Sequence, residues 1–168
     1  MRIALCGYLG SGCTEVAEIL ASKFGLDTFN TSVIIESIKD LKSFGTSGEI
    51  DLDTVIKSKL EEILKRDNVI IEGRSAFMLL DKKDVIKIFL SAPLEERIKH
   101  VAQRRGVSAE KAREDVIKSD IERNHLIQRL LNTDCLNIIN YDFTINTSSK
   151  TFSRIAETIS QIIKTLAH

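Results

Sequence analysis

Gly7-Tyr8-Leu9-Gly10-Ser11-Gly12-Cys13-Thr14 is the stretch that most narrows the possible folds of this chain. It follows a short apolar run at residues 3–6 and precedes residues 15–24, where apolar side chains recur at helical spacing. A strand, a glycine-rich turn and a helix therefore come in that order. Glycines let the backbone turn tightly and aim N–H groups inward, and a helix N-terminus adds partial positive charge. The stretch indicates a phosphate-binding site.

The spacing within this stretch follows the phosphate-binding pattern G-x-x-x-x-G-K-[ST] except at one position. Gly7, Gly12 and Thr14 match, and Cys13 stands where the pattern has lysine. We expect anion binding to survive this change, because backbone amides supply most of the cradle. Phosphoryl transfer depends more on the lysine, which neutralises charge on the phosphate being transferred. The alternative to a phosphate site is a glycine-rich turn that binds no ligand.

Cys13 allows two interpretations. A thiol at a helix N-terminus can have a lowered pKa and react with oxidants. It can equally be a small side chain that fits the turn. The sequence places no histidine or second cysteine beside it to activate or resolve the thiol, which favours the second interpretation.

The rest of the chain repeats the alternation of short apolar runs and helical stretches. Strands are predicted at residues 26–29, 69–71, 85–90 and 143–145. Helices are predicted at residues 31–41, 52–64, from Pro93 to about residue 105, 108–131 and 152–166. Strands separated by helices favour a parallel sheet with helices on both faces. We therefore expect one α/β domain spanning residues 1–168.

The composition excludes several classes of function. The 24 basic and 24 acidic residues balance, and only 5% of residues are aromatic, so a nucleic-acid partner is not expected. The chain has no apolar run of membrane-spanning length and no apolar leader, so we expect a cytoplasmic protein that does not bind membranes. Three cysteines without metal-type spacing do not predict a disulfide framework. The oligomeric state stays open.

Several segments, in this order, make the chain resemble the cytidylate kinase-like members of the nucleoside monophosphate kinase family. They are Gly10-Ser11-Gly12, Val69-Ile70-Ile71-Glu72-Gly73-Arg74, Ile88-Phe89-Leu90-Ser91-Ala92-Pro93-Leu94-Glu95-Glu96-Arg97, Asp120-Ile121-Glu122-Arg123 and Tyr141-Asp142-Phe143-Thr144-Ile145-Asn146-Thr147. The resemblance covers nearly the whole chain. It implies a three-layer P-loop kinase fold, with a helical acceptor insert at about residues 30–66 and a helical lid at about 104–131.

The resemblance also implies a reaction and its participants. The expected activity is ATP- and Mg²⁺-dependent phosphoryl transfer to a nucleoside monophosphate, with a pyrimidine (CMP, dCMP or UMP) as acceptor. The whole stretch from Gly7 to Thr14 would bind the ATP phosphates, and the Thr14 hydroxyl would ligate the metal. The implied catalytic residues are Glu72, Arg105 and Arg123, and the implied acceptor-binding residues are Ser32, Lys39 and Arg74.

Two departures from the family's pattern leave other functions open. One is Cys13, and the other is Glu36, which stands where the family usually presents an arginine to the acceptor phosphate. A carboxylate there would repel a phosphate, so Lys39 would have to replace the arginine or the acceptor would have to differ. The chain could therefore be a nucleotide-binding sensor or partner-binding module with little transfer activity. A kinase for a non-nucleotide small molecule is the third possibility.

Overall fold

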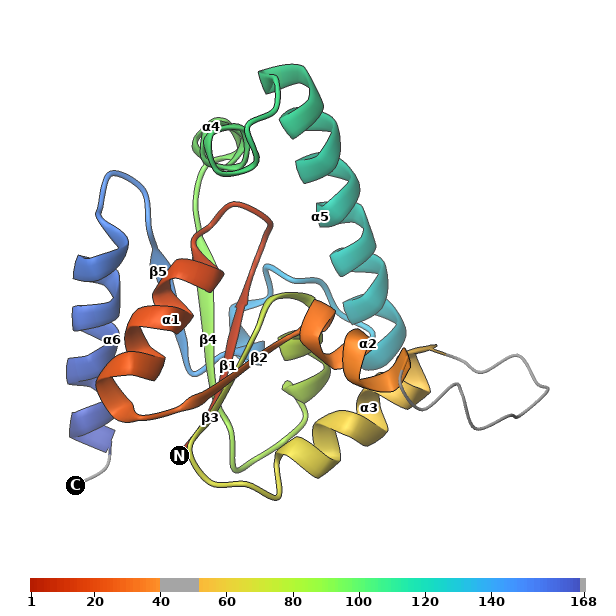
Figure 1. Ribbon diagram of the computed structural model, residues 1–168, viewed down its shortest axis with the longest axis vertical. Coiled ribbons are helices and arrows are strands. Elements are labelled where there is room, and N and C mark those ends of the chain that lie inside the picture. The colour runs from red at the N-terminus through yellow and green to blue at the C-terminus, as the bar shows by residue number, and fades with distance from the viewer. Residues whose placement is uncertain (40–51, 167–168) are drawn as a thin grey trace.

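The computed structural model describes residues 1–39 and 52–166 of the chain (Figure 1). A five-stranded parallel sheet has the order β2-β3-β1-β4-β5. Its strands are β1 (Arg2–Gly7), β2 (Asp27–Asn30), β3 (Val69–Glu72), β4 (Ile86–Ser91) and β5 (Phe143–Asn146). The helices are α1 (Cys13–Phe24), α2 (Thr31–Lys39), α3 (Leu52–Ile63), α4 (Leu94–Arg105), α5 (Ala109–Leu131) and α6 (Phe152–Leu166). Two 3-10 helices, η2 (Gly73–Leu79) and η3 (Ile138–Asn140), complete the described elements.

Three layers form because the central strand β1 is apolar on both faces. Ile3 and Leu5 point to one core with α1 and α6, and Ala4 and Cys6 point to the other. Figure 1 shows α1 and α6 together on one side of the sheet, and α2, α3 and η2 on the other. Strands buried on both faces read as continuous apolar runs, which is why the sequence showed them clearly.

The helices α4 and α5 follow each other as a two-helix hairpin at the carboxyl end of the sheet: Figure 1 shows α4 end-on and α5 crossing it and running down beside the sheet. Gly106, with a φ of 64°, ends α4, and the Ser108 hydroxyl caps α5 by accepting from the Lys111 amide at 3.2 Å. A small separate cluster of buried apolar residues joins the two helices, formed by Ile98, Val101, Ala112 and Val116. Leu9, in the glycine-rich loop, packs against this cluster, so the hairpin rests on the loop.

The order of the strands decides which residues meet at the carboxyl edge of the sheet. The strand β1 lies beside β3, with Leu5 opposite Glu72, and β3 lies beside β2, with Asn30 opposite Glu72. The loop after Gly7, the carboxylate of Glu72 and the start of α2 are therefore neighbours. Ligands of open parallel sheets bind at such an edge. Within residues 1–39 and 52–166, no helix is long and apolar enough to cross a membrane.

Candidate active site

The loop between β1 and α1 is shaped by two glycines with positive φ. Gly10 has a φ of 89° and Gly12 a φ of 94°. A Cβ atom on Gly10 would lie 2.5 Å from the backbone oxygen of Arg97, and one on Gly12 would lie 2.3 Å from the Phe152 ring. Only glycine fits either position, since the backbone conformation and the space both exclude a side chain.

Gly10→Ala tests this close approach. We expect the variant to lose about 1–3 kcal/mol more unfolding free energy than Gly25→Ala, because an added methyl must displace the backbone of α4. Gly25 is the matched control: its φ is also positive, at 64°, but a Cβ atom added there would meet nothing within 4 Å. Urea denaturation measures both variants, and equal losses would contradict the predicted clash.

The carbonyl groups of the loop all face the protein. Those from Tyr8 to Gly12 accept hydrogen bonds, in order, from the Ser11 amide (3.1 Å), Arg97 Nη1 (3.2 Å), His100 Nδ1 (3.0 Å), Thr147 Oγ1 (3.2 Å) and the Val16 amide (3.0 Å). Among the described residues, no acceptor takes a hydrogen bond from the amides of Leu9, Gly10, Gly12 or Cys13. The carbonyl oxygens of the loop are thus directed toward the protein, and its free backbone amides remain available as donors. An anion requires this arrangement.

Cys13 is buried, with 9% of its surface exposed, and lies in the first turn of α1. Burial raises the pKa of its thiol well above the ordinary value, and the Glu72 carboxylate raises it further. A thiolate nucleophile needs the opposite shift. The structure therefore supports the interpretation of Cys13 as a small side chain that fits the turn, and the loop carries an uncharged group where the usual pattern has a cation.

Thr14 and Glu72 come together beside the loop. The Thr14 hydroxyl donates to Glu72 Oε1 at 3.2 Å, and Glu72 is 5% exposed. Burial raises the pKa of the Glu72 carboxyl, and the Thr14 hydrogen bond and the nearby guanidinium of Arg104 oppose that rise. A hydroxyl and a carboxylate at this edge are hard oxygen ligands of the kind that Mg²⁺ prefers. No group of three or more His, Cys, Asp or Glu side chains within residues 1–39 and 52–166 could hold a metal without other ligands.

Arg123, on α5, reaches the loop from above. It lines a pocket of about 50 Å³ together with the loop residues, Glu72 and Arg104. Its Nη1 donates to the carbonyl and the hydroxyl of Ser119, while its Nε is buried without a hydrogen-bond partner among the described residues. Burial lowers the pKa of Arg123, but a guanidinium keeps its charge in proteins. A buried, unpartnered Nε–H on this half-buried cation is suited to an anionic ligand.

The two consecutive arginines at the end of α4 differ in position. Arg104 lines the pocket beside the loop, and its Nη1 lies 3.4 Å from Glu15 Oε1. Arg105, which the family resemblance implied as catalytic, lines neither this pocket nor the one beside it and pairs with Asp115 at 2.9 Å. Neighbouring residues on a helix point about 100° apart, so only one of the pair can face the loop. The structure brings Arg104, and not Arg105, to the site.

A second pocket, of about 300 Å³, adjoins the first. Both are lined by Thr14, Glu72, Gly73 and Arg123, and the second is also lined by Asn30, Thr31, Ser32 and Arg74. Two of the three predicted acceptor residues, Ser32 and Arg74, therefore lie where an acceptor could be held. Lys39 is the last residue of α2, and its side chain lies outside the part that the structure describes.

The sides of this second pocket are held by short polar contacts. The Ser75 amide donates to Thr31 Oγ1 at 3.0 Å, which ties the start of α2 to η2. Arg74 Nη1 lies 3.8 Å from Glu122 Oε2, and both side chains are exposed, so this pair is weak. Glu36 is exposed on α2 and does not line the pocket. The carboxylate that departs from the family's pattern is thus absent from the lining of the pocket proposed for an acceptor.

Arg97 is a structural residue of the site to which the sequence assigned no role. It is 5% exposed and forms two hydrogen bonds with Asp120, at 3.0 and 2.8 Å. Its guanidinium lies 5.1 Å from the centre of the Tyr8 ring, and it donates to the Leu9 carbonyl. A single buried cation therefore joins α4, α5 and the loop. Arg97, His100 and Arg104 follow one another at three- and four-residue steps, a helical spacing that would have pointed to one common face.

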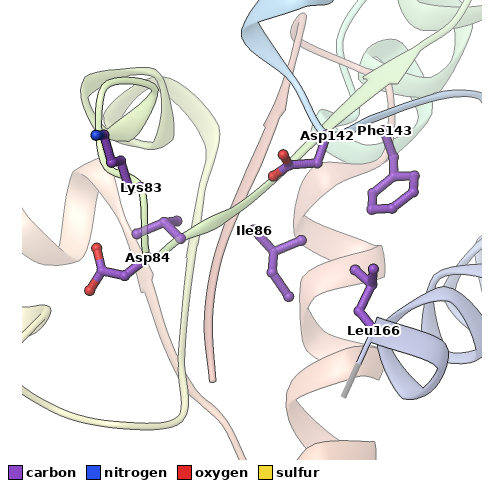
Figure 2. Close-up of a pocket in the computed structure, with 7 residues that line it drawn as sticks. Lys83, Asp84, Ile86, Asp142, Phe143 and Leu166 are labelled. Carbon is purple, nitrogen blue, oxygen red and sulfur yellow. The ribbon is translucent and has the colours of Figure 1, made fainter. Parts of the chain in front are cut away.

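Another hollow, of about 440 Å³, lies at the opposite end of the sheet, where β4 and β5 begin (Figure 2). Its two carboxylates are already engaged: Asp84 pairs with Arg2 at 2.6 Å, and Asp142 accepts from the Lys87 amide at 2.7 Å. Figure 2 shows Ile86, Phe143 and Leu166 forming the apolar part of this hollow. Its remaining charged group is Lys83, and it does not combine carboxylate, hydroxyl and arginine side chains as the edge that holds the loop does.

Comparisons with known proteins agree with one another on the family that this chain resembles. The model of the cytidylate kinase-like family matches residues 46–149. A cytidylate kinase of Sulfolobus acidocaldarius is 30% identical over 171 residues, covering 97% of this chain and 94% of that protein. A cytidylate kinase of Methanocaldococcus jannaschii is 27% identical over 176 residues, covering 99% of each chain.

Solved structures resemble the fold. An uncharacterized protein from Eubacterium ventriosum has a TM-score of 0.78 at 23% identity, with 98% of each chain covered. The shikimate kinase of Acinetobacter baumannii, solved with shikimate, has a TM-score of 0.65 at 20% identity, covering 98% of this chain and 93% of that one. These likenesses confirm the predicted three-layer P-loop kinase fold.

Proposed function

Because the chain belongs to the cytidylate kinase-like family, we propose that it transfers the γ-phosphoryl group of ATP to a pyrimidine nucleoside monophosphate, namely CMP, dCMP or UMP. The observation that carries this proposal is the pair of adjoining pockets that share Thr14, Glu72, Gly73 and Arg123. A donor phosphate in one and an acceptor phosphate in the other would meet at these shared residues. Transfer between phosphates is catalysed mainly by positioning and charge stabilisation, which such a meeting point supplies.

The smaller pocket suits the donor. Residues 8–12 hold their carbonyls away from it, so the loop amides and the N-terminus of α1 would bind the phosphates of ATP. The Thr14 hydroxyl would ligate Mg²⁺, and Glu72 would order the water molecules around the metal. The metal, when bound, supplies neutralising charge between the donor phosphates. The oxygen ligands and the buried carboxylate fit this cofactor.

The larger pocket suits the acceptor. Arg74 can release its weak pair with Glu122 and donate two parallel hydrogen bonds to the phosphate of a nucleoside monophosphate. The Ser32 hydroxyl, at the first turn of α2, would donate a further hydrogen bond. Lys39 remains a proposed acceptor residue. We assign residues 30–66 as the acceptor insert on the same grounds, within a single domain of residues 1–168.

Two arginines would supply the charge that Cys13 does not. Arg123 lies between the two pockets, and Arg104 lines the donor pocket on the side facing α4. Guanidinium groups that contact the transferring phosphate stabilise its developing charge. We propose that these residues replace the lysine of the usual loop and that residues 104–131 serve as the lid. The activity would be cytoplasmic, in keeping with three buried free cysteines.

Transfer from labelled ATP with Mg²⁺ to a panel of nucleoside monophosphates tests the proposal. The panel includes shikimate as a non-nucleotide acceptor and a control with no acceptor. Multiple-turnover transfer to CMP, dCMP or UMP is the expected result. Transfer only to shikimate or another non-nucleotide would overturn the choice of acceptor.

The buried, uncharged Cys13 favours one alternative function, a nucleotide-binding module with little transfer activity. Tight ATP binding without transfer to any acceptor would support this alternative. Cys13→Lys is then the informative variant, because gain of transfer would show that the lysine alone was missing. Rapid transfer by the parent protein would exclude the alternative.

Arg104→Ala and Arg105→Ala separate the two arginines at the end of α4. Arg104→Ala is expected to lower the transfer rate about 100-fold, because one charge partner of the donor phosphates is lost. Arg105→Ala should leave the rate within about twofold, since an exposed ion pair with Asp115 contributes little. Initial rates at saturating ATP and CMP measure both. The opposite ranking would restore Arg105 as the catalytic residue.

A further inference from the structure

Tyr8 joins the phosphate-binding loop to α5 through its side chain. Its hydroxyl donates to Asn124 Oδ1 at 3.0 Å, while its backbone carbonyl stays within the turn of the loop and accepts from the Ser11 amide at 3.1 Å. Burial raises the pKa of the Tyr8 hydroxyl to about 12, so the phenol keeps its proton and remains a donor. One residue therefore shapes the loop with its backbone and reaches a separate helix with its side chain.

The Tyr8 ring is held by two neighbours. The Phe89 ring on β4 meets it edge to face, with 5.9 Å between the ring centres and 82° between the ring planes. The Arg97 guanidinium lies 5.1 Å from the centre of the Tyr8 ring. A ring that packs against a strand and a buried cation cannot swing freely, so its hydroxyl is presented to α5 at a fixed point.

The Asn124 carboxamide accepts hydrogen bonds from two parts of the chain. Its Oδ1 takes the Tyr8 hydroxyl and also the Cys135 amide, at 3.4 Å, from the segment that follows α5. A backbone amide can only donate, so the oxygen and not the nitrogen of the carboxamide must face these partners. An aspartate at this position could therefore accept the same two hydrogen bonds.

Arg123, the residue before Asn124, depends on other residues for its place. Among the described residues its guanidinium hydrogen-bonds only to its own helix, and its Nε has no partner. Two polar contacts fix α5 beside the loop, one on each side of Arg123. The first joins Asp120 to Arg97, and the second joins Asn124 to Tyr8. The position of the guanidinium over the loop thus follows from the position of the α5 backbone.

We infer that Asn124 is a positioning residue for Arg123: the hydrogen bond from Tyr8 holds α5 where Arg123 borders both pockets. The inference rests on the proposed function, because its effect on catalysis requires that Arg123 contacts the transferring phosphate. When the contact is lost, α5 shifts relative to the loop and carries the guanidinium with it. A displacement of even 1 Å at a reacting centre can lower a rate by up to about 100-fold.

Tyr8→Phe and Asn124→Leu remove the contact from opposite sides. We expect each to lower kcat about tenfold, with the KM values for ATP and CMP within about twofold of the parent, because the loop amides and Arg74 still bind the substrates. The double variant should lose no more than Asn124→Leu alone, since both changes remove one contact. Losses that add, or a loss confined to KM, would overturn the inference.

Two further variants show whether the acceptor oxygen matters. Asn124→Asp keeps the acceptor and should recover most of the kcat that Asn124→Leu loses. His125→Leu is the matched control, because it places a leucine on the next, exposed residue of α5. Its kcat should match that of the parent. An equal loss in all three variants would show a general disturbance of α5 and would overturn the role of Asn124.

Solvent exchange of the Arg123 Nε proton, followed by ¹⁵N NMR of the nucleotide-free protein, tests the positioning without any substrate. The signal is assigned by its loss in Arg123→Lys. The Nε atom is buried, so we expect its proton to exchange about tenfold faster in Tyr8→Phe than in the parent, because a displaced α5 opens it to water. Tyr8→Phe removes a single hydroxyl group and keeps the packed ring.

The outcomes separate this inference from the proposed function. Equal exchange in Tyr8→Phe and the parent would overturn the role of Asn124 even if CMP is phosphorylated. Faster exchange in Tyr8→Phe, with His125→Leu unchanged, would sustain that role even if no acceptor is ever phosphorylated, because the position of α5 precedes transfer.

Discussion

Arg123→Ala is expected to lower the rate of phosphoryl transfer about 1000-fold, the largest loss for any single side chain of the site. Among the described residues, Arg123 is the cation that borders both pockets, so it is placed to contact the donor and the acceptor at once. Its buried Nε has no hydrogen-bond partner within the described residues, and a transferring phosphate would supply one. The loss should appear in kcat, since the contact tightens as charge develops on that phosphate.

Arg113→Ala is the matched control for this prediction. Arg113 also lies on α5, but it is exposed and paired with Glu95 at 2.7 Å, away from both pockets. The kcat of the Arg113→Ala variant should match that of the parent protein. A kcat for Arg123→Ala within about tenfold of the parent would move the stabilising role to another residue.

Glu72→Gln is expected to lower the transfer rate about 100-fold while making the fold more stable at neutral pH. The rate falls because a neutral amide orders the water shell of Mg²⁺ poorly. The stability rises because burial raises the pKa of Glu72, so ionising it costs folding free energy. The amide oxygen of glutamine can still accept the hydrogen bond from Thr14, which keeps the local geometry.

The pH dependence of unfolding distinguishes this effect from a simple packing change. A carboxyl whose pKa is raised in the folded state stabilises least above that pKa, so parent stability should decline as pH rises through the raised value. The advantage of Glu72→Gln should therefore be small near pH 4 and grow toward pH 7. Urea denaturation at both pH values measures it. A constant difference between variant and parent would contradict the assigned burial cost.

The fold was largely predictable because the three central strands, β1, β3 and β4, are buried over at least half of their length. Each of the five predicted strands lies within two residues of the observed one, and the predicted resemblance to the cytidylate kinase-like family is confirmed. Short apolar runs such as Val69-Ile70-Ile71 leave few alternatives when helical stretches separate them. The 3-10 helix at Gly73–Leu79 was not predicted, because its irregular backbone is stabilised by tertiary packing rather than by a periodic pattern.

The site was predictable only where a motif carries its own geometry. The loop, Thr14 and Glu72 follow directly from strand ends, and the structure places them together. Choosing between Arg104 and Arg105 needed the rotation of α4 relative to the loop, which no local pattern specifies. The contacts of Arg97 and His100 with the loop join residues about ninety positions apart, so they emerge only when the helix is packed.

The bridge between Arg97 and Asp120 has a consequence for how the hairpin of α4 and α5 can vary. It joins α4 to α5 at the base of their hairpin. The stretch between these two residues is therefore closed into a loop by the hydrogen bonds from the Arg97 guanidinium to the Asp120 carboxylate. The loop is shaped below that tether, through the Leu9 and Gly10 carbonyls, and the turn at Gly106 lies above it. The turn at the far end of the hairpin can therefore be lengthened or shortened while the loop carbonyls stay fixed and the phosphate cradle keeps its form.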